Sequence, residues 1–207
     1  MPAAEAARPF VTDDARVVDK GGCQVETFVK DQRRLDEREF WFVPACNPWG
    51  MELTAGYARV DSTPSGDSNT TILQAKMLLK PLEANGIGFA LSVGTFLNAK
   101  TSPYVNAIGS FSLADDRVVL HGNLGTVRDN IASRSRGTWG AGAEILLAAP
   151  RFYGILESYG QSGEKPTLHT GLRVWLVPNR AQLDTTVGVQ HATQERRFGT
   201  LGLRLLW

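Results

Sequence analysis

Alternation of apolar and polar residues, repeated in segments of about ten residues, is the feature that most constrains how this chain can fold. Near the C-terminus, Leu201, Leu203 and Leu205 share one parity, while Gly202 and Arg204 share the other. Side chains of a β-strand point alternately to its two faces. The pattern therefore predicts a strand with one apolar face and one polar face.

The same pattern recurs along almost the whole chain. Candidate strands cover about residues 22–32, 39–46, 51–61, 70–80, 86–97, 104–114, 117–128, 137–148, 151–160, 167–177, 181–192 and 197–207. Strands of this length are long for a soluble domain, where five or six residues are usual. They match the length that a tilted strand needs to cross a bilayer.

The connections between these segments fall into two groups that alternate. "NPWG", "EANG" and "PNR" are tight, whereas "DSTPSGDSNT" and "RDNIASRSRG" are longer and more polar. Short turns at one end and longer loops at the other are typical of outer-membrane barrels. We therefore predict an all-β fold, in which residues 21–207 form a single antiparallel transmembrane β-barrel of about twelve strands, with short periplasmic turns and longer extracellular loops. A soluble all-β sandwich, which buries the apolar faces in its core, is the alternative.

Charge and hydropathy exclude other classes of protein. The formal net charge is +1, so no broad basic surface is available and we expect no nucleic-acid partner. The longest weakly polar run, "GIGFALSVGTFL", has 12 residues, too few for a spanning helix of about 20. The start, "MPAAEAARPF", has the alanine-rich spacing of the end of a signal peptide without its charged and apolar regions. We expect a bacterial outer-membrane location, a native signal peptide absent from this sequence, and a periplasmic N-terminal segment over residues 1–20. A native alanine-rich N-terminus is the alternative.

The only two cysteines, Cys23 and Cys46, lie at the two ends of one predicted hairpin. If the two face each other, Lys30 falls opposite Glu39, a favourable cross-strand pair. Metal binding would need further clustered ligands, and the C-x-x-C spacing of redox pairs is absent. We predict a Cys23–Cys46 disulfide and hence an oxidising compartment. Two free thiols in a cytosolic protein are the alternative.

Charged residues on the polar faces of the strands are candidates for the lining of a lumen. They are Glu26, Lys30, Glu52, Lys76, Lys80, Glu144, Arg173, Asp184 and Arg204. Eight strands leave little interior space and sixteen leave an open channel, so about twelve strands predict a narrow pore or a ligand pocket. Because both signs are present, we expect neither strong anion nor strong cation selectivity. In the alternative, the charges pair with one another and plug the lumen.

Evidence for an enzyme is weak. The histidines lack the spacing of metal ligands, and we expect no enzymatic activity, no metal and no cofactor. A nucleophilic arrangement of His169, Asp184 and Ser158 is the one enzymatic alternative.

The C-terminal strand ends in an aromatic residue. Leu203, Leu205 and Trp207 resemble the assembly signal of bacterial outer-membrane proteins, which predicts the barrel-assembly machinery and outer-membrane lipid as partners. A terminal tryptophan buried in a soluble sheet is the alternative.

About the first 60 residues resemble a bacterial family. The segments "RPFVTDDARVVDKGGCQVE" and "EFWFVPACNPWGMELTAGYARV" are similar to the start of the outer-membrane transporters grouped as the meta-pathway of phenol degradation family. The resemblance implies a narrow channel or transporter for a small organic solute, with aromatic compounds as the class suggested by the family name. It implies no catalytic residues. A structural envelope barrel with a plugged lumen is the alternative function.

Overall fold

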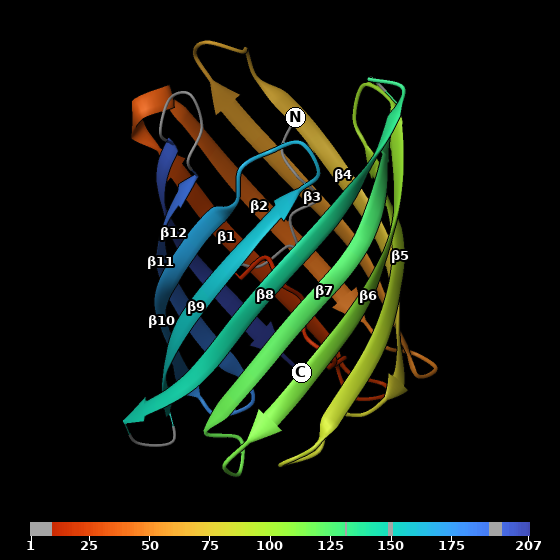
Figure 1. Ribbon diagram of the computed structural model, residues 1–207, viewed down its shortest axis with the longest axis vertical. Helices are drawn as coiled ribbons and strands as arrows, with labels where there is room; N and C mark the ends of the chain where they lie inside the picture. The colour runs from red at the N-terminus through yellow and green to blue at the C-terminus, as the bar shows by residue number, and fades with distance from the viewer. Residues whose placement is uncertain (1–9, 131, 149–150, 191–195) are drawn as a thin grey trace.

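The chain closes into a β-barrel (Figure 1). The structure, a computed structural model, describes residues 10–130, 132–148, 151–190 and 196–207. Its strands are β1 (Cys23–Gln32), β2 (Glu37–Cys46), β3 (Met51–Ser62), β4 (Ser68–Lys80), β5 (Ile87–Leu97), β6 (Thr101–Leu113), β7 (Val118–Asp129), β8 (Arg134–Ala148), β9 (Phe152–Gln161), β10 (Thr167–Val177), β11 (Ala181–Gln190) and β12 (Arg196–Leu206). The 3-10 helix η1 (Arg33–Leu35) joins β1 to β2.

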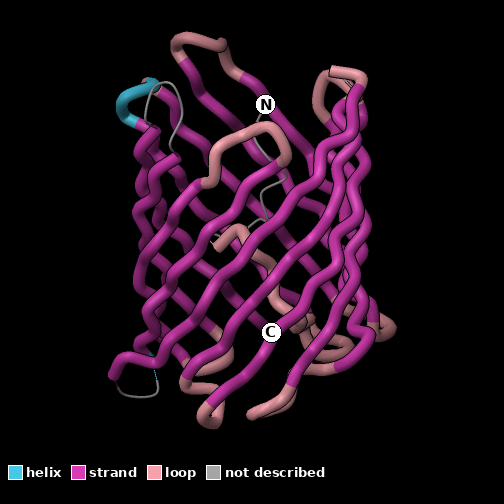
Figure 2. Tube along the Cα trace, in the orientation of Figure 1, coloured by secondary structure: helices cyan, strands magenta, loops and turns pink. Residues whose placement is uncertain are grey.

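Each strand pairs antiparallel with its neighbours in sequence, and β1 pairs with β12 to close the barrel. The predicted fold class, a closed antiparallel barrel of twelve strands, is confirmed. At the seam, the backbone N–H groups of Cys23 and Trp207 each donate to the carbonyl oxygen of the other residue. The two residues therefore lie at the same end of the barrel as the short turns (Figures 1 and 2).

Several strands extend beyond the predicted bounds into the polar connections. β8 begins at Arg134 and β6 at Thr101, three residues earlier than expected in each case. Backbone pairing does not depend on side-chain polarity, so the ladder continues past the apolar part of the strands. The connections 63–67 and 162–166 are consequently short. The two ends of the barrel therefore differ less in loop length than the sequence suggested.

Most large apolar side chains of the strands face outward, and many charged ones face inward. Leu124 and Leu201 are 71% and 57% exposed, whereas Lys76 and Glu157 are 1% and 5% exposed. This is the reverse of a soluble protein, and it suits a barrel whose outer surface meets lipid. The sandwich alternative is therefore wrong. Among the described residues, no helix is long and apolar enough to cross a membrane.

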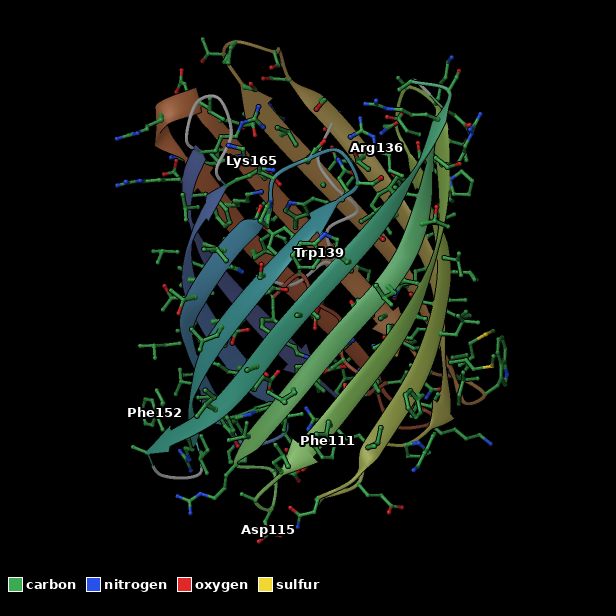
Figure 3. The ribbon with its side chains drawn as sticks, in the orientation of Figure 1. Phe111, Asp115, Arg136, Trp139, Phe152 and Lys165 are labelled. Atoms are coloured by element: carbon green, nitrogen blue, oxygen red, sulfur yellow. A yellow bond between two sulfur atoms is a disulfide. The ribbon has the colours of Figure 1, made fainter. Side chains whose placement is uncertain are left out.

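Aromatic side chains mark the short-turn end of the outer surface. Phe111 and Phe152 are 38% and 50% exposed and lie near that end (Figure 3). Aromatic rings favour the boundary between lipid and water. Arg136 and Lys165 lie at the opposite, loop end (Figure 3). Aromatic rings therefore lie near the short-turn end, and charged side chains lie at the loop end.

The described part of the N-terminal segment lies within the barrel, whereas the sequence suggested a periplasmic segment over residues 1–20. Phe10, Thr12, Ala15 and Val18 are buried, and the segment is visible inside the tube of strands (Figure 2). Its backbone N–H groups bond to side chains of the barrel wall, which replaces the water that a free segment would bind. We call residues 10–18 the internal segment. The division of the chain at residue 21 stays a prediction.

The predicted hairpin and its disulfide are confirmed. Cys23 pairs with Cys46 across β1 and β2, and the two are joined by a disulfide. The same register sets Lys30 opposite Glu39, with Lys30 Nζ 3.1 Å from Glu39 Oε1. The disulfide staples the short-turn end of the hairpin, beside the seam with β12.

We expect loss of the disulfide to destabilise the barrel. In the chain-entropy model, closing a loop of this length contributes about 3 kcal/mol. The refolded Cys23→Ser/Cys46→Ser variant should therefore lose its heat-modifiable gel mobility at a lower temperature than the unchanged protein. Mass spectrometry of non-reduced peptides from envelope protein should find Cys23 joined to Cys46. Two alkylatable thiols in that sample would contradict the assignment.

Candidate functional site

Most of the charged residues predicted to line the lumen are enclosed by the barrel. Those that are buried are Glu26, Lys30, Glu52, Lys76, Glu144, Arg173 and Asp184. Arg204 is partly buried, and its Nε lies 3.2 Å from Glu26 Oε1. Strand alternation therefore found the lumen wall, although a role for these residues in a solute path stays a prediction.

Lys80 departs from this group. The pairing of β4 with β5 shifts between Leu78 and Lys80, so that Lys80 lies opposite Phe89. Phe89 is 47% exposed on the outer surface, and Lys80 is exposed as well. Simple alternation put Lys80 on the same face as Lys76, but an irregularity of one residue reverses the faces beyond it. Lys80 is therefore not part of the lumen wall.

Arg173 on β10 joins two carboxylates from other strands. Its Nη2 donates to Asp184 Oδ2 at 2.8 Å and its Nε donates to Asp184 Oδ1 at 3.0 Å. Its Nη1 donates to Glu144 on β8. Asp184 also accepts from Gln182 Nε2 at 3.1 Å. Side chains from β8, β10 and β11 thus form a hydrogen-bonded cluster, with one guanidinium between two carboxylates, that occupies this side of the lumen.

Lys76 on β4 holds the internal segment by its charge. Its Nζ lies 2.7 Å from Asp13 Oδ1 and 3.5 Å from Asp14 Oδ1. Asn123 on β7 accepts from the backbone N–H of Asp13 at 2.7 Å and donates to the carbonyl oxygen of Asp13 at 2.8 Å. Two strands that are not neighbours in the barrel, β4 and β7, therefore bind the same residue of the segment.

Glu157 on β9 is a second anchor, and the sequence did not single it out. It accepts hydrogen bonds from the backbone N–H groups of Val11, at 3.1 Å, and Thr12. His169 Nδ1 lies 2.8 Å from the same carboxylate, and His169 Nε2 lies 2.6 Å from Thr186 Oγ1. Glu157 and the neighbouring His169 could have been found as inward-facing polar residues on adjacent strands. Strand alternation could not have shown that Glu157 binds the internal segment.

The enzymatic alternative does not form as the sequence suggested. His169 contacts Glu157 rather than Asp184, which pairs with Arg173. Ser158 follows Glu157 directly and so lies on the other face of β9. Among the residues that the structure describes, no group of three or more His, Cys, Asp or Glu side chains is placed to hold a metal ion.

Glycine on the inner face of β8 makes room for the internal segment. A Cβ atom at Gly140 would lie 2.6 Å from Thr12 Oγ1, and one at Gly142 would collide with the ring of Phe10. A larger residue at either position would therefore require the side chain of Thr12 or Phe10 to shift. Two inward-facing glycines in one strand were a signal in the sequence that another part of the chain passes close by.

A cavity of about 100 Å³ remains beside the internal segment. Its wall combines polar and apolar groups and is contributed by strands β1 to β9 together with residues 11–13. Polar lining residues include Thr12, Gln24, Glu52, Gln74, Ser92 and Asn106. Tyr104 also lines it and donates to Gln74 Oε1 at 2.7 Å, with the Phe96 ring 5.1 Å away. Such a cavity can hold a small polar molecule or several waters.

The chain belongs to the family described as "Uncharacterised conserved protein UCP029691", whose model matches residues 1–207. No curated protein matches the chain.

Solved structures with the same fold are outer-membrane barrels. The structure titled "NanC porin structure in rhombohedral crystal form" aligns with a TM-score of 0.69 at 7% identity, covering 88% of this chain and 98% of that one. The structure titled "KdgM porin" aligns at 0.65 and 9% identity, with coverage of 88% and 98%. Omp33 of Acinetobacter baumannii aligns at 0.60 and 7% identity, covering 91% and 99%. At these identities the likeness establishes the fold, which is that of a bacterial outer-membrane β-barrel.

These matches do not confirm the resemblance to the meta-pathway of phenol degradation family. That resemblance depends on the first 60 residues or so, and it stays an expectation.

Removing the Glu157 anchor should loosen the internal segment. Glu157→Ala deletes the acceptor of two backbone N–H groups, of which that of Thr12 is buried and that of Val11 partly buried, and a bond to a charged group contributes roughly 1.5–3 kcal/mol. We expect faster hydrogen–deuterium exchange in peptides from residues 10–18. Glu83→Ala, in an exposed turn, is the matched control and should not change the exchange. Equal protection of the segment in all three proteins would show that Glu157 does not hold it.

Proposed function

We propose that this barrel of the UCP029691 family is a narrow outer-membrane channel for a small organic solute, with its lumen constricted by the internal segment. The observation that carries the proposal is the cavity beside the segment, whose wall combines polar side chains with the aromatic rings of Phe96 and Tyr104. A solute path requires a hollow lined by groups that can bind the solute, and hydroxyl, amide and carboxylate groups line this one.

The barrel geometry supports a restricted path rather than an open pore. Twelve strands lie between barrels filled by side chains and wide porins. The Arg173 cluster occupies one side of the lumen and the internal segment crosses it, so the remaining space is small. A solute of a few non-hydrogen atoms suits a cavity of about 100 Å³.

The solved structures support the same class of function by analogy. Two of them are titled porins. One fold hosts many functions, so this support is weaker than that of the lumen itself. The resemblance at the N-terminus suggests aromatic solutes. The rings of Phe96 and Tyr104 in the cavity wall are compatible with that class.

A structural barrel with a plugged lumen is the second candidate, because the internal segment is fixed by several bonds. Lys76, Asn123, Ser110 and Glu157 each contact it. If the segment never moves, the lumen stays closed. An enzymatic function is not proposed.

The cellular setting of the proposal follows the fold. The outer-membrane location agrees with the apolar outer surface and with the matched barrels. Outer-membrane lipid is the expected environment, and assembly through Leu203, Leu205 and Trp207 by the barrel-assembly machinery remains a prediction.

Deleting residues 1–18 should widen the path. In planar bilayers we expect a unitary conductance several-fold above that of the unchanged protein, because the segment no longer occupies the lumen. Heat-modifiable gel mobility should show that the shortened barrel still folds. If the full chain and the folded deletion variant are both silent and bind no solute, the structural alternative replaces the channel.

Charge reversal at two lysines tests whether a charge in the lumen wall affects ion preference more than a charge on the outer surface does. Lys76→Glu adds negative charge inside the barrel and should shift the reversal potential toward cations. Lys80→Glu makes the same chemical change outside the lumen wall and should leave the potential unaltered. Equal shifts of the reversal potential in the two variants would mean that Lys76 acts through the surface potential and does not line the solute path.

A further inference from the structure

The lumen cavity is acidic, although the lumen as a whole carries both signs. Asp13, Glu26 and Glu52 are among its lining residues. Within the described part of the chain, no lysine, arginine or histidine lines it. The basic residues Arg173, His121 and His169 belong to other parts of the lumen, where they contact carboxylates.

Two of the three carboxylates have a cation beside them. Asp13 pairs with Lys76 Nζ at 2.7 Å, and Glu26 lies 3.2 Å from Arg204 Nε. These pairs neutralise their own charges. The net charge of the cavity lining therefore depends on the third carboxylate, that of Glu52.

Glu52 is bound by neutral donors. Its Oε2 accepts from the backbone N–H of Val18 at 2.9 Å and from Gln24 Nε2 at 3.3 Å. Among the described residues, no lysine, arginine or histidine nitrogen forms an ion pair with Glu52. Lys76, its partner across β3 and β4, turns its ammonium to the internal segment instead. Glu52 is only 4% exposed. A buried carboxylate without a counter-ion is costly, so a cation in the cavity would be favoured.

The internal segment adds an unused polar group to the same cavity. Thr12 is 2% exposed and its Oγ1 has no hydrogen-bond partner. Buried hydroxyl groups are normally bonded. A ligand with a hydrogen-bonding group of its own would satisfy this hydroxyl. Aromatic rings at Phe96 and Tyr104 can cover the carbon atoms or the charge of such a ligand.

We propose that the cavity binds a small organic cation, an ammonium compound carrying a hydroxyl group, with Glu52 as counter-ion and Thr12 as a hydrogen-bonding partner. This inference rests on the proposed function, because the cation is then the solute that the channel passes. Small anions are disfavoured by the same carboxylate. The cavity should therefore prefer cations to anions, although the lumen as a whole carries charges of both signs.

Three probes of similar size test the charge of the ligand. Ethanolammonium, ethylene glycol and glycolate are titrated calorimetrically into the refolded full-length protein. We expect ethanolammonium to bind at least about tenfold more tightly than ethylene glycol, the increment typical of a hydrogen bond to a charged group, and glycolate to bind least. Binding of glycolate as tight as that of ethanolammonium would overturn the proposal.

Two variants locate the site. Glu52→Gln keeps the size of the side chain and should remove the preference for ethanolammonium over ethylene glycol. Glu83→Gln, in an exposed turn, is the matched control and should retain it. Thr12→Val should weaken ethanolammonium binding by about threefold or more, because one hydrogen bond is lost. If Glu52→Gln does not fold, Thr12→Val decides the matter, and unchanged affinity in that variant overturns the site.

Bilayer recordings separate this inference from the proposed function. A conducting protein that binds no ethanolammonium overturns the cation site and leaves the channel. A protein that binds ethanolammonium through Glu52 but neither conducts nor transports it keeps the site and overturns the channel. A protein that neither binds ethanolammonium nor conducts overturns both the cation site and the channel.

Discussion

Closure of the backbone hydrogen-bond ladder is the constraint on which the rest of the structure depends. Lipid offers no partner to an exposed N–H or C=O group, so a sheet that spans a membrane must have no free edge. Here β1 pairs with β12, and Cys23 and Trp207 complete the seam with reciprocal backbone bonds. Closure forces every strand to present one face to lipid and the other to an enclosed lumen. The inversion of apolar and charged residues follows from that division.

The enclosed lumen imposes a second requirement, because its buried charges need partners. Some find them in neighbouring strands, as Arg173 does with Glu144 and Asp184. Others are satisfied by the internal segment, whose backbone donates to Glu157 and Glu52. The segment in turn obtains bonds that water would otherwise supply. Barrel and segment therefore stabilise each other, and the inner glycines of β8 leave the space in which they meet. Among the described residues, the cavity lies where neither the internal segment nor the Arg173 cluster fills the lumen.

Much of the fold could be predicted from the sequence, because its strongest signals are local. Alternation identified the strands and their faces, and the register of the first hairpin followed from pairing Cys23 with Cys46. Once those two face each other in antiparallel strands, Lys30 must face Glu39. Prediction failed at Lys80, where an irregular pairing of β4 with β5 reverses the faces. Alternation assumes unbroken pairing and contains no information about such irregularities.

The candidate site was only partly predictable, because its decisive contacts join residues far apart in the chain. By itself, the sequence determined an amphipathic barrel, its disulfide and most of the predicted charges that face inward, with Lys80 as the exception and Glu157 as an omission. Only the tertiary structure decided which charges meet. It brought Thr12 to Glu157, Asp13 to Lys76 and the internal segment into the lumen. The physical reason is that strand periodicity fixes the direction of a side chain but not the distance across the lumen. The path of a segment outside the sheet is set by the side chains it meets there.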